Sequence, residues 1–149
     1  VRDYVTQYYE PAAIGTNTMT ADAGAPAREL AAWKQRVVAA WPDVRVQLGD
    51  GPGVDGGAAG EMRDVVVDLD PGALGGDEIV VQLLHGPLLA DGSFDEALLH
   101  VVPMAAGDDG RFHVTFAPDR AGRWGAAARA LPTHPHLRNL FDTGVVAIG

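Results

Sequence analysis

Apolar residues recur every three or four positions between residues 30 and 41, which predicts an amphipathic helix over residues 30–42. The residues of its apolar face are Leu30, Trp33, Val37 and Trp41. Pro42 disfavours the α conformation of the residue before it, so we expect the helix to stop there. Two large indole rings on one face predict that this helix packs against the structure that follows it.

After Pro42 the hydrophobic period changes from 3.6 to 2, as in a half-buried strand. Short apolar runs separated by turn signals then recur to the C-terminal end. They lie at residues 44–48, 65–69, 79–84, 98–104, 112–116, 123–131 and 144–148. The run at 123–131 is rich in alanine, which favours a helix, but its alternation and its neighbours favour a strand. The pattern predicts a mainly β fold, an immunoglobulin-like antiparallel β-sandwich of about seven strands over residues 43–149, preceded by one or two short helices.

The first residues carry a separate helical pattern over 1–13, which Pro11 ends. Tyr4, Tyr8 and Tyr9 lie on its apolar face and are candidates for packing against a partner. Residues 14–29 are small and polar and include glycine and proline, so we expect a linker there.

Charge and composition exclude several classes of function. The net charge is −9, and the basic residues are spread singly, so we expect neither a nucleic-acid partner nor an anionic membrane surface. No apolar run reaches the roughly 18 residues of a membrane span. The chain has no cysteine, which excludes disulfides and thiolate metal sites and fits a cytoplasmic location.

Candidate catalytic and metal-binding groups are sparse. His134 and His136 form the closest histidine pair, with Asp142 as the nearest third ligand, but surface polar residues in a proline-rich turn are the favoured interpretation. The acids around residues 68–78, including Glu78, lack the spacing of a calcium loop and are expected to be solvated turn residues. The glycine-rich loop over residues 49–60 lacks the lysine of a phosphate-binding loop. We therefore predict no catalytic, cofactor-binding or metal-ligating residue.

Several strings, in this order, resemble the C-terminal region of bacterial and archaeal α-glucan (glycogen) phosphorylases. They are VRDYVTQYYEPAA, LAAWKQRVVAAWPDVRV, HGPLLADG, VVPM, the GRWG turn and LPTHPHL followed by GVV. The combination is specific and spans nearly the whole chain, although each string alone is weak. The glycine-rich loop and the linker have no counterpart in the resemblance.

The resemblance implies a parent enzyme that uses pyridoxal phosphate and releases glucose 1-phosphate from α-1,4-glucan. The family's cofactor lysine and substrate-contacting residues would precede Val1, so no catalytic residue can be assigned in this numbering. We therefore expect a C-terminal fragment with no cofactor of its own.

Three roles follow for such a segment. The first is an accessory domain that docks on the catalytic domain of the parent or forms a homo-oligomer interface. The second is a carbohydrate-binding module, for which Trp124, Phe94 and Phe141 are the candidate contacts with glucan or another partner. The third, an autonomous enzyme, has the least support. Exposure of the aromatic rings separates the first two roles, because sugar platforms need rings that face water.

Overall fold

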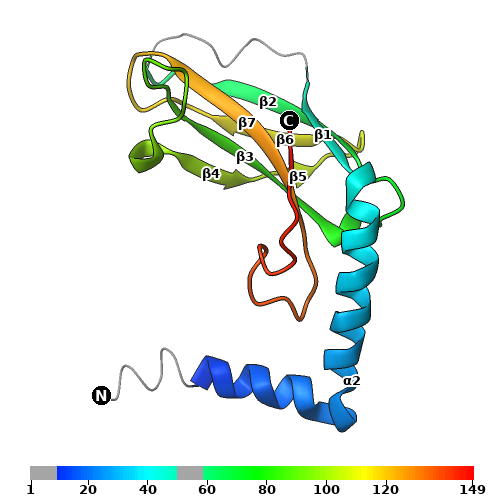
Figure 1. Ribbon diagram of the computed structural model, residues 1–149. Coiled ribbons are helices and arrows are strands. Elements are labelled where there is room, and N and C mark those ends of the chain that lie inside the picture. The colour runs from blue at the N-terminus through cyan, green and yellow to red at the C-terminus, as the bar shows by residue number, and fades with distance from the viewer. Residues whose placement is uncertain (1–9, 50–58) are drawn as a thin grey trace.

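A computed structural model describes residues 10–49 and 59–149, as one long helix followed by a two-layered β-structure (Figure 1). Helix α2 (Glu10–Ala40) leads through the short 3₁₀ helix η2 (Trp41–Asp43) into the strands. The strands are β1 (Arg45–Leu48), β2 (Arg63–Asp70), β3 (Ile79–Pro87), β4 (His100–Pro103), β5 (Ala105–Ala106), β6 (Phe112–Phe116), β7 (Trp124–Pro132) and β8 (Ala147–Ile148). Two further 3₁₀ helices are η3 (Gly76–Glu78) and η4 (Glu96–Leu98).

The strands form two antiparallel sheets, which confirms the predicted β-sandwich. The first sheet, here called sheet A, has the order β1-β2-β6-β5, and the second, sheet B, has the order β4-β3-β7-β8. The described residues contain eight strands rather than about seven, because the run predicted over 98–104 is divided. Its strand ends at Pro103, and the chain passes through the buried Met104 into β5 of the other sheet. The Met104 amide donates to the Val81 carbonyl at 2.9 Å and fixes this crossing.

Alternating residues of both sheets fill the core between them. Val81 and Leu83 of β3 pair with Ala130 and Ala128 of β7, and none of these four side chains is exposed to solvent. The small alanines lie beside larger side chains, so the two strands together fill the layer without overpacking. The alanine-rich segment is therefore a strand, as its alternation predicts, and its helix propensity is overridden by this pairing.

The expectation of a linker over residues 14–29 is wrong as to local structure, since α2 runs through them. Alanines favour the helix here and outweigh the glycines. Gly24 has a φ of +79° and Pro26 lies inside the helix, where it cannot donate a backbone hydrogen bond. The helix changes direction in this part, as Figure 1 shows.

Two sequence predictions fall outside the described residues. They are the helix face of Tyr4, Tyr8 and Tyr9, and most of the glycine-rich loop, residues 50–58. No helix in the described ranges is long and apolar enough to cross a membrane.

Candidate functional site

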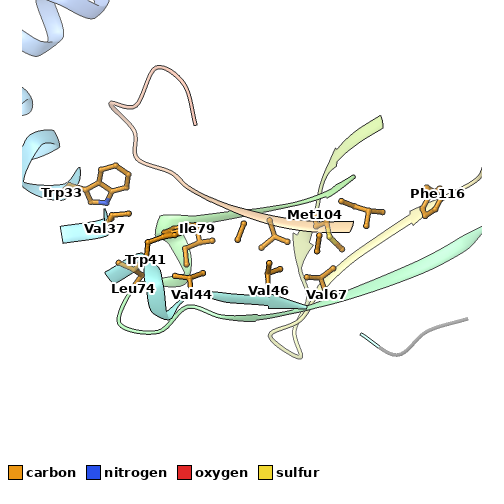
Figure 2. Packing of buried hydrophobic residues seen from close by; sticks show 14 of the residues in the cluster. Trp33, Val37, Trp41, Val44, Val46, Val67, Leu74, Ile79, Met104 and Phe116 are labelled. Atoms are coloured by element: carbon orange, nitrogen blue, oxygen red, sulfur yellow. The ribbon is translucent and has the colours of Figure 1, made fainter. Parts of the chain in front are cut away.

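The end of α2 is fixed to one end of the sandwich through a buried apolar cluster. Trp33 and Trp41 are each 6% exposed and Val37 is fully buried, as the helical spacing predicts. They share the hydrophobic core with Leu74, in the turn before β3, and with Ile79, the first residue of β3 (Figure 2). Helix and sandwich therefore form one packed unit at this point, here called the helix joint.

Glu78 is the polar centre of the helix joint. Its carboxylate accepts a hydrogen bond from the Trp33 indole N–H at 2.8 Å and from the Gly75 backbone N–H at 3.0 Å. The Arg36 guanidinium also donates to both carboxylate oxygens, with Nη1 at 3.1 Å from Oε2. Hydrogen bonding to Arg36 is the largest of the effects that lower the pKa of Glu78 to about 2, and partial burial opposes it. The interpretation of Glu78 as a solvated turn acid is wrong, because it links β3 to α2.

The His134–His136 segment also belongs to the helix joint. The His134 ring lies 4.8 Å from the Trp33 ring, and the amide of Thr133 donates to the Glu78 carbonyl at 2.8 Å. His134 Nδ1 accepts from the His136 amide at 3.2 Å. Within residues 10–49 and 59–149, no cluster of three or more histidine and acidic side chains is arranged to hold a metal ion.

The three aromatic candidates for sugar contact differ in exposure. Trp124 is only 2% exposed, and its indole N–H donates to the Arg120 carbonyl at 3.1 Å. Phe94 is half-buried, whereas Phe141 is 53% exposed. Burial of Trp124 removes the largest ring from any platform, so the structure does not bring the three candidates together on one exposed surface.

The family assignment rests on the sandwich. Residues 41–148 match the family described as the glycogen phosphorylase C-terminal domain. The chain belongs to this family. Similar proteins include the glycogen phosphorylases of two strains of Mycobacterium tuberculosis and one of Mycobacterium bovis, each 30% identical over 152 residues. The alignments cover 99% of this chain and 18% of each relative.

The residues of this glycogen phosphorylase C-terminal domain do not fit pyridoxal phosphate, the cofactor that the resemblance implies for a parent enzyme. The single lysine, Lys34, is half-buried on α2 and lines a shallow apolar groove with Gln35, Val38 and Ala39. In the described part of this groove, no second cation or cluster of backbone donors could bind the cofactor's phosphate.

His85 is a buried histidine in the core of the glycogen phosphorylase C-terminal domain. Its ring centre lies 3.9 Å from that of Phe116 and 5.1 Å from that of His100, and the residue is 6% exposed. Burial is the main cause that lowers the pKa of His85 below its ordinary value, and the neighbouring His100 adds to it, while Asp119 opposes it. The folded protein therefore favours the neutral ring.

This burial predicts a loss of stability in mild acid. The unfolded state binds a proton at His85 near pH 6.5, whereas the folded state binds it only at a lower pH. The contribution of the neutral His85 ring to the free energy of unfolding is therefore complete above pH 6.5 and falls as the pH decreases below it. We expect His85→Phe to flatten the decline of the unfolding free energy between pH 7 and pH 5, measured by urea denaturation. His113→Phe is the contrast, because it removes an exposed contact with Asp109 rather than a buried ring and should not flatten the decline. An unchanged decline in His85→Phe would contradict the prediction.

Proposed function

We propose that this chain is a non-catalytic accessory domain that docks on the catalytic domain of a glycogen phosphorylase. The parent enzyme would release glucose 1-phosphate from α-1,4-glucan with pyridoxal phosphate in its catalytic domain, in the cytoplasm. The chain spans less than a fifth of the length of the relatives it matches, which supports a role as part of a larger polypeptide.

The observation that carries this proposal is the helix joint. Trp33, Val37 and the Glu78 network fix the end of α2 to the sandwich. From the helix joint α2 leads away from the sheets, and beyond its change of direction its first part lies apart from them (Figure 1). A helix fixed at one end and projecting at the other is suited to connect the sandwich to a second body in a defined orientation.

The carbohydrate-binding role is the second candidate. The exposed ring of Phe141 favours it, because flat rings facing water are what sugar stacking requires. Burial of Trp124 argues against it. The docking role therefore has the stronger support.

Isothermal titration of the 149-residue chain with the separately produced catalytic domain tests the docking role. We expect saturable 1:1 binding, and no heat of binding when maltoheptaose replaces the catalytic domain. Absence of binding to the catalytic domain would contradict the proposal. Saturable micromolar binding of maltoheptaose, lost in Phe141→Ala, would support the carbohydrate-binding role instead.

We also expect the isolated chain to release no glucose 1-phosphate from glucan, phosphate and pyridoxal phosphate. The reason is that the only lysine, Lys34, lies in an apolar groove whose lining offers no phosphate-binding group. A coupled assay for glucose 1-phosphate measures this, with an intact phosphorylase as the positive control. Turnover that scales with the concentration of the chain would overturn the assignment as non-catalytic.

A further inference from the structure

The outer face of sheet B is largely apolar. The strand register aligns two rows of outward side chains across the sheet. One row contains Val101, Leu84 and Ala127, and the other contains Pro103, Gln82, Arg129 and Ile148. Val101 is 44% exposed and Ile148 is 72% exposed, although both are aliphatic. These rows, together with Phe141, are here called the apolar face.

The Phe141 ring packs against Arg129, the only charged side chain of the apolar face. The Arg129 guanidinium lies 5.2 Å from the centre of the Phe141 ring, and its Nε donates to the Gln82 amide oxygen at 2.8 Å. Arg129 is the one ionisable side chain at the outward positions of β3, β4, β7 and β8. Its positive end is thus shielded by an aromatic ring and held in place by an amide.

The outer face of sheet A has the opposite character. Its outward positions on β1, β2 and β6 include the charged or titratable residues Arg45, Asp64, Asp68, Asp70 and His113. The Asp68 carboxylate pairs with the Arg111 guanidinium at 2.6 and 2.7 Å, and both side chains are about half exposed. The two outer faces of one sandwich therefore differ sharply, with sheet A suited to water and sheet B suited to a protein surface.

We propose that the apolar face of sheet B is the surface that the catalytic domain of the same polypeptide covers, a proposal that rests on the docking role above. The matching surface would be mainly apolar, with an acidic or carbonyl oxygen facing Arg129. The relatives carry this segment in a chain more than five times its length. A tethered domain reaches an effective concentration in the millimolar range, which favours it over free partners.

A second copy of this chain is a less suitable occupant. A dimer with two-fold symmetry centred on the apolar face would place the two Arg129 guanidinium groups near each other. Like charges brought together in a desolvated interface oppose association. The geometry thus favours a different surface as the partner.

Single cysteines can test this inference, because the chain contains none. Val101→Cys and Ile148→Cys report on the apolar face. Met62→Cys, at 68% exposure close to that of Ile148, and Thr115→Cys on sheet A are the matched controls. Each variant is labelled with a maleimide in the 149-residue chain and in a polypeptide that joins the chain to its catalytic domain, and peptide mass spectrometry gives the labelling rate.

We expect the longer polypeptide to slow labelling at Val101→Cys and Ile148→Cys at least tenfold, and at both controls less than twofold. Protection of Met62→Cys or Thr115→Cys instead would overturn the apolar face as the contact but leave the docking role intact. Unchanged rates at all four sites would overturn the apolar face as the contact, and the titration with the catalytic domain would then decide the docking role separately. Concentration-dependent protection of the two apolar-face sites in the 149-residue chain alone would show that a second copy is the occupant.

Discussion

Truncating Trp41 to alanine is expected to lower the free energy of unfolding by about 3–5 kcal/mol, which is a large share of the stability of a domain of this size. The residue is 6% exposed and belongs to the same core as Val37, Leu74 and Ile79. Removing the indole therefore leaves a cavity where the helix meets the sandwich, lined by side chains of both. Trp33→Ala should have an effect of the same order.

Phenylalanine substitutions separate packing from hydrogen bonding at these two positions. The Trp41 indole N–H has no hydrogen-bond partner among the described residues, so Trp41→Phe removes no polar interaction. Trp33→Phe in contrast removes the bond to Glu78 and should cost about 1–2 kcal/mol more than Trp41→Phe. Urea denaturation followed by circular dichroism measures all four variants. The surface control is Val38→Ala, and a loss below about 0.5 kcal/mol in Trp41→Ala would show that this ring is not buried.

Glu78→Gln is the second substitution with a large expected effect, a loss of about 2–3 kcal/mol at pH 7. The magnitude follows from hydrogen bonds to a charged, partly buried carboxylate, which contribute more than neutral ones. An amide keeps the shape of the side chain, but it cannot accept from Trp33, Arg36 and the Gly75 amide at the same time. The helix joint is therefore expected to loosen without a change in the core between the sheets.

Glu78 is also expected to make the free energy of unfolding depend on pH. The pKa of Glu78 is lowered from 4.5 to about 2 in the folded protein, so the unfolded state takes up its proton first as the pH falls. Its contribution to stability is thus complete above about pH 4.5 and is lost progressively between pH 4.5 and pH 2. The unfolding free energy of Glu78→Gln should decline less over this range than that of the unaltered chain. Asp77→Asn, an exposed acid in the same turn, is the matched control, and equal declines in both variants would contradict the prediction.

Side-chain periodicity alone determined the main elements of this protein. Spacing of three and four placed Trp33, Val37 and Trp41 on a buried helix face, and alternation placed the alanine-rich segment at 123–131 in a strand. These features are local, because the period of a segment decides which of its side chains share a face. The linker prediction for 14–29 failed for a local reason too, since helix propensity there outweighed the glycine and proline signals.

The tertiary structure alone decided the features that depend on contacts between distant residues. Glu78 meets Trp33 and Arg36 across more than forty positions of sequence, so its own turn, where it accepts only from the Gly75 amide, does not reveal these two contacts. Trp124 could have faced water or the core, and its pairing opposite Pro87 placed it inside. Alternation likewise fixes which residues share a face of a strand but not what covers that face. The contrast between the charged face of sheet A and the apolar face of sheet B emerges only once strand order and register bring their outward residues into rows.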